Sequence, residues 1–575
     1  MTLALVMPWT LQAQRAPVAA THGMVASSEA YASEVGAEIL RRGGNAVDAA
    51  VATGLALAVT YPRAGNLGGG GFMLIHLADG RDVVIDYRET APAAATANMF
   101  LGPDGKALTG TASSTLGWRA SGVPGTVAGF ALAVKKYGSG KLTWAELVEP
   151  ARRLAAEGHV LSQAAAGDLA SYARKLGRFA ESKKVFLGDG QPCAAGGRWV
   201  QADLGATLAR LQEQGPREFY EGETARRIAA AMAQHGGLIT AADLKGYVAV
   251  ERTPLRGTYR GCEIVTVPPP SSGGIALLSM LAMLEPFDLA AIGHNSAAKY
   301  HLLNEVMRRA FRDRAEFLGD PDFVTVPVAG LLDRDYLRGR MADFDPQRAS
   351  VSAGYPAGKP AGASARPAAN VGRKESPETT HYSVIDAAGN VVANTYTLNG
   401  LFGSGVTVPG TGILLNNEMD DFAVQLGVPN MFGLIQGEAN VIAPGKRPLS
   451  SMTPTMVFRE GKLLLVTGSP GGPTIINTVL QVILNVVDHR MPVTQAVEAS
   501  RVHHQWLPDV LTYERFGLSA DTAALLRAMG HTLKERDADE GSYQGGAESI
   551  ARDPATGRWL GAADPRKPDS KAVGF

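Results

Sequence analysis

The chain has 575 residues, of which 45% are hydrophobic and 19% charged, so it can bury a large core and is not globally disordered. Its 55 basic and 55 acidic residues cancel, and this balance argues against nucleic acid or another polyanion as a partner. The only cysteines, Cys193 and Cys262, are too few for a thiolate zinc site and allow one disulfide at most.

The first segment, residues 1–16, contains a short apolar run from Thr2 to Leu11. As a helix this run would span about 15 Å, half the hydrocarbon core of a bilayer. It is typical of the apolar region of a signal peptide, with Ala13 near a cleavage point, although no basic residues precede it; an unstructured start is the alternative. We therefore expect a periplasmic or secreted protein without a membrane span.

Helices and strands alternate through the next part of the chain. The pattern over 27–59 predicts two helices with a break at a Gly-Gly-Asn sequence, and four glycines at 68–71 lead into an apolar strand. A second strand ends at Arg88. Residues 126–250 read mostly as amphipathic helices, a few strands follow, and 297–317 is helical again.

Residues 346–378 lose this periodicity and are rich in Ala, Pro, Gly and Ser, so we expect an exposed flexible linker. Directly after it, His381 to Leu398 predicts a β-hairpin that turns at Gly389-Asn390. More strands and a helix from about Thr474 follow. Strands and helices on both sides of the linker predict one layered α/β core.

Two threonines, Thr379 and Thr397, frame this hairpin. A threonine hydroxyl is a poor nucleophile without a base, but a threonine at the start of a chain carries its own α-amine as base. Cleavage between Glu378 and Thr379 would create that arrangement, if the hydroxyl attacks the carbonyl of Glu378 and water resolves the resulting ester. From these residues alone an ordinary hairpin remains the alternative.

A Gly-rich turn at 467–472, TGSPGG, joins an apolar strand to a helix. The N–H groups of Gly471 and Gly472 would form an oxyanion hole there, or the sequence is only a turn. Thr467 breaks the GxSxG pattern, so Ser469 is a weak candidate nucleophile. The GGGGF stretch lacks the GxGxxG spacing of a nucleotide site.

Three further motifs carry charge or hydroxyl groups, and each has a plain alternative. The acids of NNEMDDF would bind a cation or lie on a solvated loop. The serines of KRPLSSM would donate to an anion or cap a turn. Arg88 would hold a carboxylate through two hydrogen bonds or pair with a surface acid.

Many motifs, taken in order, resemble the γ-glutamyltransferases (γ-glutamyl transpeptidases) of the N-terminal-nucleophile hydrolase superfamily: GGNAVDAAVA, GGGGFM, DYRETAP, PPPSSGG, LGDPDF, TTHYSVID, TYTLN, GILLNNEMDDF, KRPLSSMTPT, TGSPGG and HHQWLPD. The resemblance runs from about residue 20 to Phe575. It implies a four-layer αββα sandwich. It also implies autocleavage before Thr379 into a large subunit, 17–378, and a small catalytic subunit, 379–575, which stay together as a heterodimer.

The resemblance assigns a role to each candidate. Thr379 would be the nucleophile and Thr397 would orient it, while the oxyanion hole would be Gly471 and Gly472. The γ-glutamyl ammonium would be held by Asn399, Glu418 and Asp421. The α-carboxylate would be held by Arg88, Ser450 and Ser451. The implied reaction transfers the γ-glutamyl group of glutathione and related compounds to water, an amino acid or a dipeptide, without metal or cofactor.

One departure concerns a lid loop, where Phe432 stands at the position of a tyrosine in many bacterial members. It lacks the hydroxyl that would bond Asn399, so the lid would admit water or bulkier acyl groups. A cephalosporin (glutaryl-7-aminocephalosporanic acid) acylase of the same family is therefore an alternative, and an exported binding protein that does not self-process is a second. Asp421 favours a γ-glutamyl substrate, because an acyl chain without an amine would leave this carboxylate unpaired.

Overall fold

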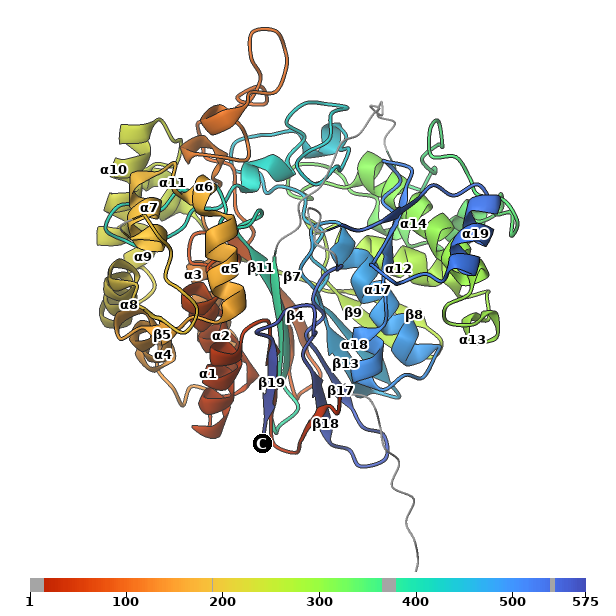
Figure 1. The fold of residues 1–575 in the computed structure, drawn as a ribbon, viewed down its shortest axis with the longest axis horizontal. Helices are drawn as coiled ribbons and strands as arrows, with labels where there is room; N and C mark the ends of the chain where they lie inside the picture. Colours follow the sequence, from red (N-terminus) through yellow and green to blue (C-terminus); the bar gives the residue numbers. More distant parts are fainter. Residues whose placement is uncertain (1–14, 189, 364–378, 538–542) are drawn as a thin grey trace, which may run out of the picture.

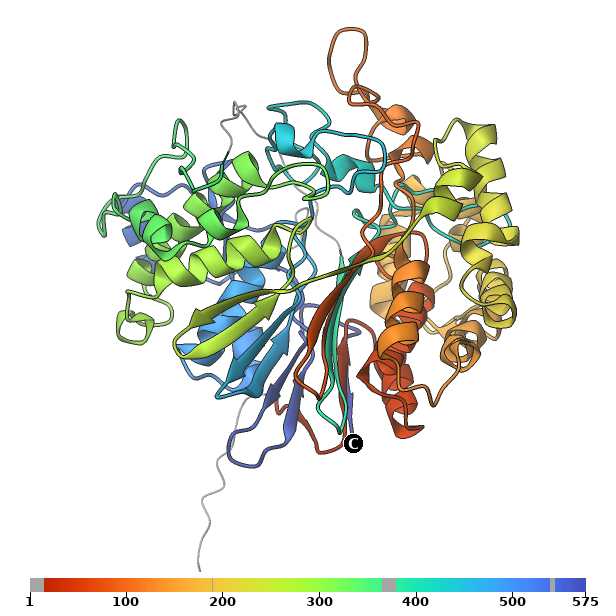
Figure 2. The ribbon, with the colours of Figure 1, turned by 180° about the vertical axis from the view of Figure 1, so that it is seen from behind.

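The computed structural model describes residues 15–188, 190–363, 379–537 and 543–575. Two seven-stranded sheets pack against each other at the centre, and helices cover both outer faces (Figure 1, Figure 2). These four layers confirm the predicted αββα sandwich. The first 14 residues, where the signal-like run was predicted, lie outside the described residues.

The first sheet has the hairpin of the two threonines at its centre. Its strands, all antiparallel to their neighbours, are in order β19 (Lys571–Gly574), β2 (Met24–Ser27), β10 (Thr380–Ile385), β11 (Val391–Thr397), β3 (Gly70–His76), β4 (Asp82–Asp86) and β7 (Val250–Arg252). The predicted hairpin is therefore present. Because strands pair with β10 and β11 on both outer sides, the hairpin is held in register by its neighbours.

The second sheet is also antiparallel and combines distant parts of the chain. Its order is β1 (Val18–Ala20), β18 (Trp559–Ala562), β17 (Ser549–Arg552), β13 (Lys462–Thr467), β12 (Thr455–Arg459), β9 (Cys262–Thr266) and β8 (Leu255–Tyr259). Apolar side chains of both sheets, among them Phe72, Ile385, Val265 and Met456, form one buried cluster between them. This cluster is the inner layer of the core.

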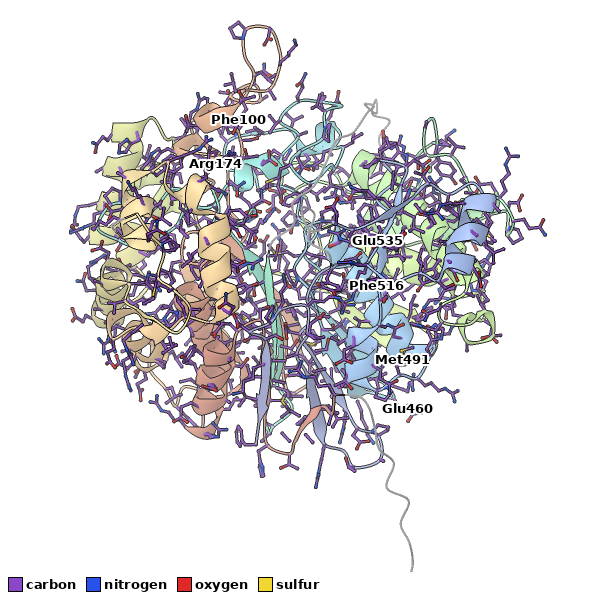
Figure 3. All side chains as sticks on the ribbon, in the orientation of Figure 1. Phe100, Arg174, Glu460, Met491, Phe516 and Glu535 are labelled. Atoms are coloured by element: carbon purple, nitrogen blue, oxygen red, sulfur yellow. The ribbon has the colours of Figure 1, made fainter. Side chains whose placement is uncertain are left out.

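Helices form a separate core on each outer face. Against the first sheet pack α1 (Ala30–Arg41), α2 (Ala46–Thr60) and α3 (Thr126–Tyr137), while α4 (Trp144–Ala156) packs on α2 and α8 (Ala202–Gln214) packs on α4. Against the second pack α12 (Gly273–Leu284), α14 (Ala297–Phe317) and α17 (Thr474–Val487). Side chains fill the space between these layers (Figure 3). Among the helices of the described residues, none is both long and apolar enough for a membrane crossing.

Part of the predicted linker differs from the expectation of exposed chain. Ser352 is fully buried, and Ser350 donates its backbone N–H to Glu305 of α14 at 3.0 Å. The N–H of Gly358 likewise reaches Asp313 on the same helix at 2.9 Å. Buried helix carboxylates thus provide hydrogen-bond acceptors that the composition of the linker did not indicate. Residues 364–378 lie outside the described part. Both cysteines are free.

Candidate active site

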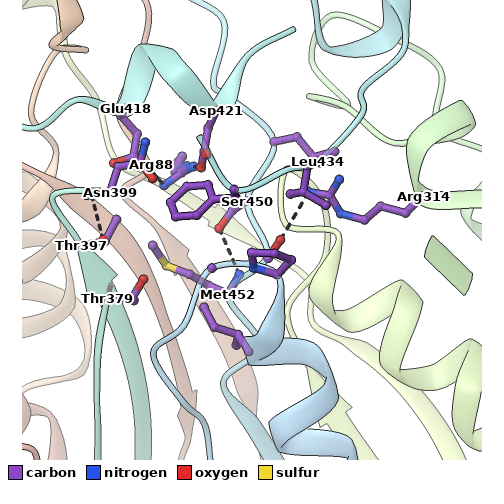
Figure 4. Close-up of a pocket in the computed structure, with 16 residues that line it drawn as sticks. Arg88, Arg314, Thr379, Thr397, Asn399, Glu418, Asp421, Leu434, Ser450 and Met452 are labelled. Carbon is purple, nitrogen blue, oxygen red and sulfur yellow. Dashed lines mark hydrogen bonds and ion pairs between the residues drawn. The ribbon is translucent and has the colours of Figure 1, made fainter. Parts of the chain in front are cut away.

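One pocket collects nearly every predicted site residue (Figure 4). Its walls include Arg88, Thr379, Thr397, Asn399, Glu418, Asp421, Phe432, Ser450, Ser451 and Gly472. Gly471 is next to the lining but is not part of it. Glu378, the residue before the predicted cleavage point, lies outside the described residues. Motifs between Arg88 and Gly472 thus meet at one place.

The hairpin register explains why the two threonines meet. Thr380 is paired with Tyr396 in the β10–β11 ladder, so the next residue pair outward is Thr379 and Thr397. Thr379 is only 4% exposed. Thr397 Oγ1 accepts a hydrogen bond from the N–H of Asn399 at 2.8 Å, which holds its side chain in place (Figure 4).

The Gly-rich turn carries two N–H groups at the start of α17. Gly471 and Gly472 have backbone φ angles of 130° and 54°, which residues other than glycine rarely adopt. Within the described part of the chain, neither N–H donates to another group. The turn therefore offers two donors at a helix N-terminus, suited to a developing negative charge. Ser469 is fully buried, donates to Pro470 O at 2.7 Å and does not line the pocket.

Arg88 contacts two of the predicted ammonium-binding acids directly. Its guanidinium bonds Glu418, Asp421 at 2.5 Å and the Pro448 carbonyl at 3.2 Å. Arg88 and Glu418 are buried, and the Asp421 side chain is 13% exposed. The residues expected to bind opposite ends of the substrate therefore form one continuous ionic group, with a cation and anions side by side.

Burial and pairing act in opposite directions on these charges. Burial raises the pKa of Glu418 and of Asp421, and the neighbouring Arg88 partly offsets this effect. For Arg88, burial alone would lower the pKa, but the carboxylates of Glu418 and Asp421 raise it. The guanidinium therefore stays charged.

Two buried residues of this region were missed by the sequence analysis. Glu89 follows Arg88, and neither of its carboxylate oxygens has a hydrogen-bond partner among the described residues. Burial raises the pKa of Glu89 to about 8. Arg314 of α14 also lines the pocket. No local signal marked either residue, since one lies beside a motif already used and the other lies inside a long helix.

The lid segment places Phe432 over the Gly-rich turn. Phe432 is 3% exposed, and a Cβ built on Gly472 would lie 2.9 Å from its ring. Near Asn399 the lid presents Met431 instead, whose sulfur lies 3.9 Å from Asn399 Nδ2. Asp420 does not line the pocket, because it accepts from Ser114 Oγ at 2.5 Å and from the N–H of Met431 at 2.9 Å. Through these two bonds Asp420 links Met431 of the lid to Ser114.

His301, Glu305 and His531 form a possible metal cluster away from this pocket, with ligand atoms within 4.8 Å of one another. The two imidazoles already bond each other at 2.7 Å. Glu305 accepts from Arg309 at 2.5 Å and from Ser350 Oγ at 2.6 Å. Donor atoms that are already bonded beside a buried arginine fit a hydrogen-bond network better than a cation.

The whole chain is similar to known proteins. A sequence model described as Gamma-glutamyltranspeptidase matches residues 32–574. The protein named Glutathione hydrolase proenzyme from Escherichia coli (strain K12) is 48% identical over 564 residues, which cover 97% of this chain and 93% of that relative.

Two solved structures are also similar. The cephalosporin acylase from Bacillus halodurans has a TM-score of 0.84 at 27% identity and covers 100% of this chain and 99% of its own. A chain of the Helicobacter pylori gamma-glutamyltranspeptidase has a TM-score of 0.56 at 40% identity and covers 61% of this chain and 97% of its own. The match over almost all residues, with the pocket described above, shows that the chain belongs to the gamma-glutamyltranspeptidase family.

Proposed function

We propose that this chain is a self-processing γ-glutamyltransferase and glutathione hydrolase in which Thr379 is the nucleophile. The observation that carries the proposal is the hairpin register, which sets Thr379 opposite Thr397 in the pocket that contains Gly472 and the Arg88 ionic group. In the active form the small fragment begins at Thr379. Its α-amine, which ordinarily titrates near 7.7–8.0, then accepts the hydroxyl proton.

The reaction proceeds through an ester. Thr379 Oγ1 attacks the γ-amide carbonyl of the donor, and the oxygen of the tetrahedral intermediate accepts hydrogen bonds from the N–H groups of Gly471 and Gly472. The amine leaves with a proton returned from the α-ammonium of Thr379. Water or the amine of an amino acid or dipeptide then attacks the ester and releases the γ-glutamyl group.

The charged wall of the pocket selects the donor. A γ-glutamyl group carries an ammonium and a carboxylate on one carbon, and Glu418 and Asp421 suit the first while Arg88, Ser450 and Ser451 suit the second. Asn399 supplies a further polar contact. No metal or organic cofactor takes part in these steps.

Self-processing divides the chain after Glu378 into pieces of 378 and 197 residues. Two comparisons support this part of the proposal. The Escherichia coli relative is named a proenzyme. The Helicobacter pylori chain covers 61% of this sequence but 97% of itself, as expected for a separate piece about as long as the larger fragment.

The location and the acceptors are also proposals. The apolar run of residues 2–11 supports export to the periplasm. Cell fractionation of a host that expresses the full chain tests this point, since export predicts activity in the osmotic-shock fluid, and activity confined to spheroplasts overturns it. Transfer rates measured with glycylglycine and with free amino acids show which kind of acceptor the enzyme prefers.

An acylase is the second candidate, favoured by the similarity to the Bacillus halodurans cephalosporin acylase over the whole chain. Turnover of L-γ-glutamyl-p-nitroanilide and of glutaryl-7-aminocephalosporanic acid by the same preparation separates the two. We expect a kcat/KM at least about 30-fold higher for the γ-glutamyl donor, because the glutaryl group has no ammonium for Asp421. A preference for the glutaryl compound would overturn the proposal.

A further inference from the structure

Arg314 is a second buried arginine of the pocket, besides Arg88. It belongs to the last turn of α14, and its guanidinium reaches the pocket from the side away from Arg88 (Figure 4). The residue is 2% exposed. Its position in the pocket wall puts it within reach of a bound substrate.

The charge of Arg314 is not balanced by an ion pair. Arg88 bonds Glu418 and Asp421, but among the described residues no carboxylate lies within ion-pair distance of Arg314. In the same part of the chain, Nη1 of Arg314 has no hydrogen-bond partner. Burial lowers its pKa to about 10, which leaves it charged at neutral pH. A buried, unpaired cation is costly unless an anion binds beside it.

The other nitrogens of Arg314 hold the two serines of the pocket. Nε donates to Ser272 Oγ at 2.8 Å, and Ser272 Oγ donates in turn to the backbone carbonyl of Ser450 at 2.7 Å. Nη2 donates to Ser451 Oγ at 3.3 Å. The guanidinium thus contacts the side chain of Ser451 directly and supports the backbone of Ser450 through Ser272, whose own N–H also donates to the Ser450 carbonyl at 2.8 Å.

These contacts also set the direction of both hydroxyl groups. A guanidinium can only donate, so Ser451 Oγ is the acceptor of that bond and keeps its own hydrogen for another acceptor. Ser450 Oγ similarly accepts from the N–H of Met452 at 3.1 Å. Two O–H donors beside a guanidinium without an ion-pair partner among the described residues form a subsite for a carboxylate.

We propose that Arg314 is a positioning residue for the α-carboxylate of the donor, acting through Ser451 and, by way of Ser272, through Ser450. The inference rests on the proposed function, because that carboxylate belongs to the γ-glutamyl group. Arg314 and Arg88 together balance Glu418 and Asp421, so a donor whose α-carbon carries both charges enters without changing the net charge of the pocket.

The experiment compares two donors that differ only at the α-carboxylate: L-γ-glutamyl-p-nitroanilide and its α-carboxamide. Arg314→Met keeps the apolar stem and removes the charge, and Arg314→Lys keeps the charge. Ser272→Ala breaks only the relay. Arg312→Met is the matched control, because Arg312 lies on the same helix, is buried, and bonds Glu316 at 3.0 Å and Tyr355 O at 3.1 Å outside the pocket.

For Arg314→Met we expect KM for the carboxylate donor to rise roughly 10- to 100-fold, with kcat changed less than about threefold. KM for the carboxamide donor should change less than about threefold. Compared with Arg314→Met, Arg314→Lys should restore part of the preference for the carboxylate donor over the carboxamide donor. Ser272→Ala should lower this preference about 3- to 10-fold relative to wild type, a smaller loss than in Arg314→Met. Arg312→Met should keep the wild-type preference.

The two levels of the proposal fail in different ways. Wild type that turns over neither donor overturns the proposed function. If wild type is active, two results overturn the inference alone. The first is that Arg314→Met loses turnover of both donors equally. The second is that Arg314→Lys and Ser272→Ala both keep the full wild-type preference for the carboxylate donor. The lysine and alanine variants decide the question even if the methionine variant does not fold.

Discussion

Arg88, Glu418 and Asp421 bring together parts of the chain more than 300 positions apart, and their contact could not be read from the sequence. The family resemblance assigned each of them to one end of a zwitterionic substrate, and the sign of each charge agrees with that prediction. That they also bind one another depends on tertiary packing. A bound substrate therefore competes with an existing ion pair, and removal of one partner leaves a buried charge unpaired.

Asp421 supplies the negative charge proposed to bind the α-ammonium of the donor. Asp421→Asn keeps the shape but removes the charge that would face the α-ammonium. We expect kcat/KM for L-γ-glutamyl-p-nitroanilide to fall about 30-fold or more, because unpairing a buried charge costs about 2–5 kcal/mol. Self-cleavage, followed on a denaturing gel, should slow by less than about threefold.

Asp488→Asn is the matched control, since the Asp488 side chain is only 4% exposed and bonds an arginine, Arg260, at 3.1 Å but does not line the pocket. The control variant should keep the wild-type preference for L-γ-glutamyl-p-nitroanilide over glutaryl-p-nitroanilide, whereas Asp421→Asn should lose this preference. Equal losses of turnover and self-cleavage in Asp421→Asn would show that Asp421 is only structural.

Glu89 leads to a prediction about pH. Its pKa of about 8 in the folded chain lies above the ordinary value of 4.5. Between these values the folded protein keeps a proton that the unfolded chain releases, so the free energy of unfolding falls as pH rises through this window. The free energy of unfolding of wild type should fall, relative to that of Glu89→Gln, which cannot ionise at this position, by up to about 1.4 kcal/mol per pH unit between pH 5 and 8.

Urea denaturation at pH 5.5, 6.5 and 7.5 measures this difference. Glu38→Gln serves as control, since the Glu38 side chain on α1 is 58% exposed and its loss should leave the pH dependence of wild type intact. If the free energy of unfolding depends on pH in the same way in wild type and Glu89→Gln, Glu89 is ionised in the folded protein.

At the scale of elements, long periodic segments were predicted well and the residues of irregular loops were not. The helix over 297–317 and the hairpin with its turn at Gly389 have the predicted positions, because apolar periodicity and turn residues are local signals. The partner of Asn399 in the lid could not be predicted, since Met431 reaches it through a loop without periodicity. Arg314 was missed because α14 carries many charged residues, all of them read alike from the sequence, and only the fold shows that nearly all are buried and that this one lines the pocket.

The lid gives a prediction at this scale. Phe432→Ala removes the ring that covers Gly472 and widens the pocket on that side. We expect the ratio of glutaryl-7-aminocephalosporanic acid turnover to γ-glutamyl anilide turnover to rise about 10-fold, the range over which pocket volume controls selectivity. Leu426→Ala, on the same segment but 47% exposed, should leave the ratio unchanged. An unchanged ratio in Phe432→Ala would mean that the ring does not limit the acyl group.

At the scale of the whole molecule, the two proposed fragments share both sheets. In the first sheet β10 lies between β2 of the large fragment and β11 of the small one. In the second sheet β12 of the small fragment pairs with β9 of the large one. Separation of the fragments would break both ladders and expose the core between the sheets.

We therefore expect the fragments to stay together after cleavage. In native gel filtration they should co-elute at the volume of the uncut Thr379→Ala chain, and they should separate only in denaturant. Elution of the small fragment alone in native buffer would contradict the shared-sheet arrangement.

The N-terminal sequence of the small fragment tests the central claim most directly. Scaling the 60.2 kDa chain by residue number predicts fragments of about 40 and about 21 kDa, before any removal of a signal segment. The smaller should begin Thr-Thr-His-Tyr, and Thr379→Ala should stay uncut. A small fragment that begins elsewhere, or an uncut wild type that turns over γ-glutamyl donors, would contradict Thr379 as the self-generated nucleophile.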